Sequence, residues 1–195
     1  MMYSGKLPVV FESGGKEYQF HSDFREWIRF ESLITNSDVP EIVRDTLALK
    51  LVFAGKIPDN MLDAIEFMMW FYGGGQPKKD TSDDKRDNTK SCLETRRVYD
   101  FEYDFEFLYA AFLEQYGVDL IDVPYLHWWK FRAMFKGLHD CRLTEIMGYR
   151  GADIDNDDMP DSRKAYLLDM QELYELPVSL TERRRIAKAR AYFNA

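Results

Sequence analysis

The residues whose spacing first suggests chemistry are the carboxylates at 153–158, which begin at alternate positions as in a calcium-binding loop. The pattern then departs from that of an EF-hand. Its sixth position, which needs glycine, is Asp158, and its twelfth, which needs a bidentate glutamate, is Lys164. We therefore interpret this stretch as a solvated acidic loop, in which Asp161 complements the N-terminus of a helix. We predict no metal site.

Histidine and cysteine side chains are the next candidates for a metal site or for a nucleophile–base pair. His127 precedes Trp128 and Trp129, and His139 lies two residues before Cys141, but the chain has no CxxC, HxxxH or HExxH motif. We therefore expect packed or surface histidines. The adjacent tryptophans are interpreted as core residues rather than as a platform for stacking on bases or sugars.

Three successive glycines at 73–75 resemble part of a phosphate-binding loop. They follow a predicted helix rather than a strand, and the Gly-Lys-Ser/Thr ending of such a loop is missing. The G-x-S-x-G motif of a nucleophile elbow is absent, and the scattered carboxylates define no catalytic pair. We therefore predict a protein that is not an enzyme, with no catalytic residues and no cofactor.

The charge of the chain argues against a general nucleic-acid binder, because its formal net charge is −8. Residues 179–195 are an exception, with a local charge of about +4 against about −12 for the remainder. The basic residues of this segment are Arg183, Arg184, Arg185, Lys188 and Arg190. Three interpretations stay open: a solvated helix, a helix that docks on an acidic protein surface including this protein's own acidic body, and contact with nucleic acid.

The location of the protein is predicted from what its sequence lacks. The nearest candidate for a membrane span, residues 65–72, is far shorter than the roughly 18 apolar residues that such a span needs. The N-terminus has no signal-peptide pattern, and two cysteines do not predict a disulfide framework. We therefore expect a cytoplasmic protein without a membrane partner.

Helices are predicted to position these residues, because apolar side chains recur at steps of three and four along most of the chain. The exception is a small β-hairpin at the N-terminus, where 8–11 and 16–20 flank a Ser-Gly-Gly turn. Helices are predicted over 23–34, 39–53, 57–72, 104–116, 124–136, 143–149, 162–175 and 181–192. The predicted fold class is mainly α, a multi-helix bundle with a small N-terminal β-hairpin.

A polar stretch divides the predicted elements. Residues 73–91 contain no large apolar side chain and predict a flexible linker or loop. This stretch separates 1–72, a hairpin plus three helices, from 92–195, a helical part with an aromatic helical hairpin. Because 1–72 alone make a small core, we favour two halves docked into one helical body over two separate domains.

Seven segments carry a resemblance to a known family. They are YD at 103–104, YAAF at 109–112, YGVDL at 116–120, LHWWKF at 126–131, IMGYR at 146–150, DFREWIRFE at 23–31 and WFY at 70–72. In these segments the chain resembles the bacteriophage gp-fifteen family over most of its length, to about Arg150. The resemblance implies a protein encoded in the tail module of a long-tailed phage or prophage of a Gram-positive host, and members are thought to be tail assembly chaperones.

The leading hypothesis that follows is a non-enzymatic chaperone in the host cytoplasm that binds the phage tape-measure protein, or other tail proteins, during tail morphogenesis. The helix predicted over 57–72 is apolar almost all round, which is typical of a deeply buried helix or of one with a surface for a partner. The predicted partner-binding residues are Met61, Met68, Met69, Trp70 and Phe71.

Two alternatives stay open beside that hypothesis. The first is a permanent structural protein of the virion, in the tail or its connector. The second is a small DNA-binding regulator that uses the basic residues 183–185. A homo-oligomer is compatible with each of these hypotheses.

Overall fold

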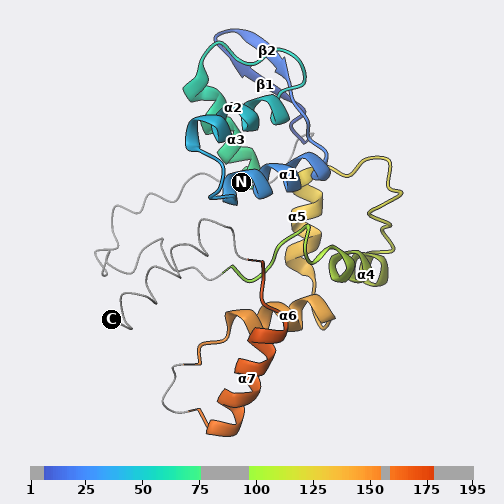
Figure 1. Cartoon of the computed structure of the whole chain (residues 1–195). Coiled ribbons are helices and arrows are strands. Elements are labelled where there is room, and N and C mark those ends of the chain that lie inside the picture. The colour runs from blue at the N-terminus through green and yellow to red at the C-terminus, as the bar shows by residue number, and fades with distance from the viewer. Residues whose placement is uncertain (1–6, 76–96, 155–158, 178–195) are drawn as a thin grey trace, which may run out of the picture. The chain divides into compact units, whose positions relative to one another are not determined.

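The structure, a computed structural model, describes residues 7–75, 97–154 and 159–177 (Figure 1). The described elements are β1 (Val10–Ser13), β2 (Lys16–Gln19), α1 (Phe24–Thr35), α2 (Glu41–Val52), α3 (Met61–Tyr72), α4 (Phe105–Tyr116), α5 (Trp128–Gly137), α6 (Arg142–Gly151) and α7 (Asp161–Leu173). The fold is mainly α with a small N-terminal β-hairpin, which confirms the predicted class. None of these helices has both the length and the apolar character that crossing a bilayer requires.

Several predictions fall on parts of the chain that the structure does not describe. These are the predicted linker beyond residue 75, the acidic loop at 155–158, and the predicted helix over 181–192 with its basic residues.

The described residues divide into two units, and neither unit is continuous in the sequence. The first contains 7–75 and 123–136, and the second contains 97–122, 137–154 and 159–177. This division differs from the predicted one, because 123–136 belong with the N-terminal elements rather than with the C-terminal part. The helical hairpin predicted over 104–136 is therefore not a unit of the structure, since α4 and most of α5 lie in different units.

Backbone hydrogen bonds join the segment before α5 to the start of α1. The Phe24 N–H donates to the Leu126 carbonyl at 2.9 Å, and the Trp128 N–H donates to the Ser22 carbonyl at 2.8 Å. Between these bonds, the Leu126 N–H donates to Oδ2 of Asp23 at 3.0 Å. The segment is therefore extended where it meets α1, and α5 begins four residues later than the predicted start at Pro124.

Stacked aromatic rings form the core of the first unit. Phe24 and Phe131 are stacked with centroids 4.9 Å apart, Trp27 lies 4.6 Å from Phe71, and Trp128 lies 5.6 Å from Phe131. Each of these five side chains is at most 1% exposed. Aromatic pairs contribute about 0.5–1.5 kcal/mol each beyond the burial of their area, so this cluster holds α1, α3 and α5 together.

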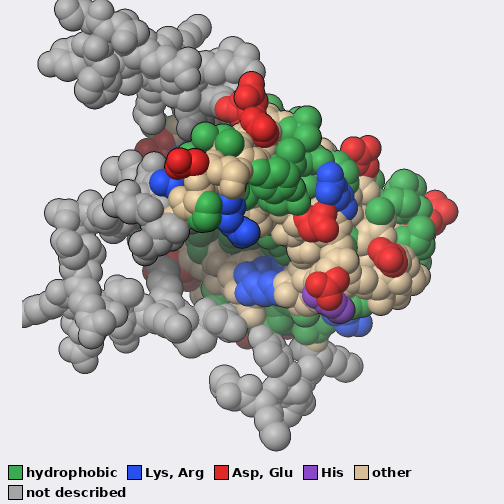
Figure 2. All heavy atoms as spheres, turned by 90° about the horizontal axis from the view of Figure 1, so that it is seen from below, with side chains coloured by type: hydrophobic (Ala, Val, Ile, Leu, Met, Phe, Trp, Pro, Cys, Tyr) green, Lys and Arg blue, Asp and Glu red, His purple; other side chains and the backbone are tan. Residues whose placement is uncertain are grey.

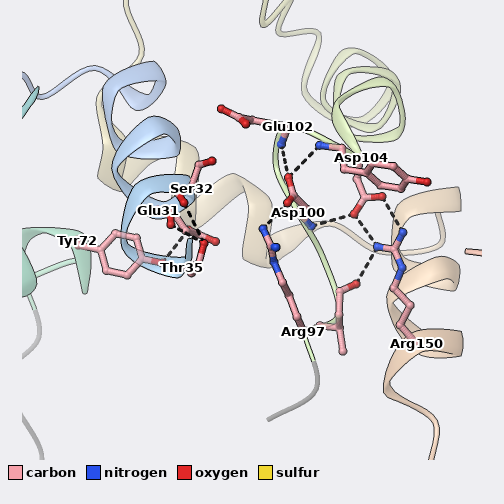
Figure 3. Close-up of polar contacts among 11 residues, drawn as sticks. Glu31, Ser32, Thr35, Tyr72, Arg97, Asp100, Glu102, Asp104 and Arg150 are labelled. Atoms are coloured by element: carbon pink, nitrogen blue, oxygen red, sulfur yellow. Dashed lines mark hydrogen bonds and ion pairs between the residues drawn. The ribbon is translucent and has the colours of Figure 1, made fainter. Parts of the chain in front are cut away.

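The second unit contains a buried ion pair between α4 and α6, shown in Figure 3. The Arg150 guanidinium donates to both carboxylate oxygens of Asp104, at 2.6 and 2.9 Å. It also donates to the backbone carbonyls of Tyr174 at 2.6 Å and Val98 at 3.1 Å. The two charged side chains are only 4% and 2% exposed, so a satisfied polar network lies inside this unit.

Candidate partner-binding surface

Helix α3 is the element on which the partner-binding residues were predicted. It begins after Asn60, whose side chain accepts hydrogen bonds from the backbone N–H groups of Leu62 at 3.1 Å and Asp63 at 3.4 Å. Its buried face consists of Ala64, Phe67, Met68 and Phe71. Since almost every other position is also apolar, the remaining faces carry hydrophobic side chains into solvent.

The structure separates the five predicted partner-binding residues into two groups. Met61, Met69 and Trp70 are 52%, 45% and 39% exposed, so they lie at the surface of the described residues. Met68 and Phe71 are 3% and 0% exposed, so they belong to the core and not to a surface. The prediction of a surface at these two positions was wrong, because the sequence of a helix that is apolar almost all round does not show which face is turned inward.

Further exposed hydrophobic residues were not among the predicted ones. Leu62 on α3 is 74% exposed, and Ile42, Val43 and Leu47 on α2 are 83%, 46% and 43% exposed. Only the C-terminal half of α2 is buried, through Ala48, Leu49 and Val52. The sequence offered a weak signal, since α2 has apolar residues on more than one face. Figure 2 shows that hydrophobic side chains also reach the surface among acidic and basic ones on the face drawn there.

The C-terminal end of α3 is fixed by two indole groups. Nε1 of Trp128 donates to the Tyr72 carbonyl at 3.0 Å, and Nε1 of Trp129 donates to the Phe71 carbonyl at 2.8 Å. Carbonyls in the last turn of a helix lie beyond the reach of its own N–H groups, so the two indoles give hydrogen bonds to this end of α3 and join α3 to α5. The phenolic hydroxyl of Tyr72 donates to Glu31 of α1 at 2.7 Å, a contact drawn in Figure 3.

The glycines after α3 form a tight turn against Trp129. The Gly74 N–H donates to the Phe71 carbonyl at 3.0 Å, and the Gly75 N–H donates to the Trp70 carbonyl at 2.9 Å. Gly75 has φ +74°, and a Cβ atom added to it would lie 2.3 Å from Cη2 of Trp129. Glycine is therefore required at 75 by both backbone conformation and space. The three glycines therefore end helix α3, and Gly75 packs against the ring of Trp129.

Trp70 lies at the edge of this aromatic cluster. Its ring packs edge-on against that of Trp129 with centroids 5.3 Å apart, and lies 5.9 Å from the ring of Phe67. Its outer part is exposed while its inner part is held by neighbours. This arrangement presents a large apolar ring in one orientation, which reduces the entropy lost when a partner covers it.

His127 is a core histidine, the first of the two positions, packed or surface, that were expected for it. It is 2% exposed; its Nδ1 accepts from the Trp129 N–H at 3.0 Å, which leaves Nε2 to donate to the Pro8 carbonyl at 3.1 Å. Both ring nitrogens are satisfied in the neutral form. Burial lowers the pKa of His127 below its usual value, and the charge of nearby Lys130 lowers the pKa further.

The other residues considered for chemistry have structural contacts. Cys141 is buried and precedes α6, and its N–H donates to Oγ1 of Thr144 at 3.1 Å. His139 accepts at its backbone carbonyl from the Gln115 side chain at 2.6 Å. Within 7–75, 97–154 and 159–177, no three His, Cys, Asp or Glu side chains gather in an arrangement that would hold a metal ion.

Comparison with known proteins gives the family of the chain. A search of curated proteins and a search of solved structures found no match. The family model described as Bacteriophage Gp15 protein matches residues 4–176, which include all the elements described above. This match extends beyond Arg150, where the resemblance seen in the sequence ended. The chain belongs to the Bacteriophage Gp15 protein family.

Proposed function

We propose that this phage protein is a non-enzymatic tail assembly chaperone, which binds the tape-measure protein in the host cytoplasm while the tail is built. The observation that carries the proposal is the exposure of Met61, Met69 and Trp70 on a helix whose opposite face is already buried in an aromatic core. Membership of a bacteriophage protein family supports a role in the phage, and the tail role is what the resemblance implies.

The exposed residues suit a partner that is itself a helix with an apolar face. Methionine is unbranched and polarisable, so it adapts to side chains of different shape, and the Trp70 ring supplies a large apolar area. A typical apolar side chain gains about 1.5–3 kcal/mol when fully buried, so three half-exposed ones contribute about 2–4 kcal/mol. A micromolar complex needs about 8 kcal/mol, so a partner must also cover neighbouring apolar residues such as Leu62.

The proposal is tested by co-elution on size exclusion with a soluble fragment of the tape-measure protein from the same phage. Replacement of Met69 and Trp70 by serine is expected to abolish co-elution, because it removes two exposed apolar contacts and leaves the buried face of α3 unchanged. The control is Leu168→Ser on α7, a residue of the second unit that is 49% exposed, which is expected to co-elute like the wild type. Circular dichroism checks that both variants keep their helix content.

Two results would contradict the proposal. One is the absence of co-elution together with no gain in solubility of the tape-measure fragment on co-expression. The other is a stoichiometric amount of the protein in purified virions, measured by mass spectrometry, because this result favours a permanent structural role in the tail or connector.

A further inference from the structure

A cleft with an apolar floor and an acidic rim lies between β1 and α3. Its volume is about 590 Å³, within the range of small-ligand and peptide sites. The floor consists of Phe11, Phe67 and Trp70; the first two rings are stacked at 4.3 Å, and the last two lie 5.9 Å apart.

The rim consists of Glu12, Asp63 and Glu66. Asp63 accepts a hydrogen bond from the Ser13 hydroxyl at 2.6 Å, which fixes β1 against α3 and holds the cleft in shape. Within the described parts of the chain, no cation lies within ion-pair distance of Glu12 or Glu66. Three acidic groups around an apolar floor, of which Trp70 is the exposed ring, favour a ligand that is both apolar and basic.

We infer that this cleft binds the basic C-terminal segment of the same polypeptide, residues 179–195. That segment has five basic residues and one acidic residue, whereas the remainder of the chain has a net charge of about −12. Within the segment, Ile186, Ala189 and Phe193 recur at steps of three and four, so a helical conformation would place them on one face. A helix would also place Arg183 and Arg190 on that side, where they could meet a carboxylate rim.

Binding of the segment 179–195 to the cleft of its own chain is favoured over binding to another chain, because the segment is covalently attached. A tethered segment that can span the distance to its site meets it at an effective concentration in the millimolar range, which would allow a weak charge-assisted contact to form without a second chain. Ion pairs at an exposed rim contribute only about 0.2–1 kcal/mol each and are screened by salt. The contact is therefore readily displaced. This inference does not depend on the tape-measure proposal, because it concerns only residues of this chain.

The test is zero-length carbodiimide cross-linking of the full-length protein at low salt, followed by peptide mass spectrometry. The reagent joins a lysine amine to a carboxylate in direct contact, so a product between Lys188 and Glu12 or Glu66 is expected. The ion pair of Lys16 with Asp59, at 2.7 Å, serves as the internal positive control. An equal mixture of ¹⁵N-labelled and unlabelled protein shows whether the two peptides come from one chain.

Variants make the test specific. Replacement of the three arginines 183–185 by glutamine keeps Lys188 and both carboxylates, and is expected to lower the yield of the cross-link about tenfold while the Lys16–Asp59 product stays constant. Trp70→Ser is expected to lower the yield as well, because it removes part of the apolar floor.

Three outcomes would overturn the inference. The first is cross-linking of Lys188 to exposed carboxylates without preference for the cleft. The second is a yield that neither the arginine replacements nor Trp70→Ser change. The third is a product in which labelled and unlabelled peptides are joined in the proportion that random pairing of chains gives, which would assign the cleft to a second copy. The inference is supported by a cross-link from Lys188 to Glu12 or Glu66 within one chain whose yield falls in both the arginine variant and Trp70→Ser.

Discussion

Replacing Arg150 by methionine tests the buried polar network of the second unit most directly. Methionine keeps the length of the side chain but removes two bonds to Asp104 and two to backbone carbonyls. The Asp104 side chain, 2% exposed, would then be a buried charge without its counter-ion. Breaking a buried pair in this way costs about 3–5 kcal/mol, which lowers the ratio of folded to unfolded molecules by a factor of roughly 10² to 10⁴.

Hydrogen exchange followed by mass spectrometry is the suitable assay, because it reports on each helix separately. Backbone amides of α4 and α6 are expected to exchange faster in Arg150→Met, whereas those of α1 and α3, in the first unit, should change much less. Arg142→Met is the control on the same helix. The Arg142 side chain is 51% exposed and pairs with Glu145 near the surface, so its replacement should have a small effect.

The double variant Asp104→Leu with Arg150→Met adds a second criterion. It removes both charges, so it should be less destabilised than either single variant. The reasoning is refuted if α4 and α6 in Arg150→Met exchange within about threefold of the wild-type rate, because a buried unpaired carboxylate cannot cost so little.

Three further predictions concern the first unit. Gly75→Ala should lower the midpoint of urea unfolding more than Gly14→Ala does. Both glycines have positive φ, but only at 75 would the new Cβ meet a ring, that of Trp129 at 2.3 Å. Equal decreases in the two midpoints would contradict this steric argument. Because the pKa of His127 is lowered by folding, the unfolded chain takes up the proton first as the pH falls below about 6.5. Stability measured by urea unfolding between pH 7.5 and 5.5 should therefore fall by up to about 1.4 kcal/mol per pH unit from this group, and His127→Gln should flatten the slope. Phe71→Ala removes a side chain that is 0% exposed and should cost about 3–5 kcal/mol in thermal or urea unfolding; a loss below about 1 kcal/mol would mean that the site is not a packed core.

Local patterns were sufficient to predict most helices and the hairpin. The helix predicted over 104–116 is α4, Phe105–Tyr116, and Gly117 has the left-handed conformation, with φ +63°, predicted for its C-cap. These features depend on residues within one or two turns of each other. The start predicted at Pro124 was wrong because Leu126 bonds to residues about 100 positions earlier, and a local pattern contains no information on such a partner.

The candidate surface could be predicted only in part for the same reason. The sequence of α3 shows a surplus of apolar side chains, but whether Met68 or Met69 is buried depends on where the other helices pack. The pair of Asp104 with Arg150 was not predicted either, although both residues lie in segments that carried the family resemblance. A single carboxylate and a single guanidinium 46 positions apart have no mutual spacing to detect.

The discontinuity of the first unit has a consequence during synthesis on the ribosome. Phe24 and Trp27 become available early, but their partners Phe131 and Trp128 are translated about 100 residues later. Roughly 60 residues separate the end of α3 from residue 136, where the second segment of this unit ends. The ribosome adds roughly 5–20 residues per second, so it needs about 3–12 s to translate them. During that interval Phe24 and Trp27 lack the rings that cover them in the finished unit, so the nascent N-terminal half exposes apolar surface that can associate with other chains.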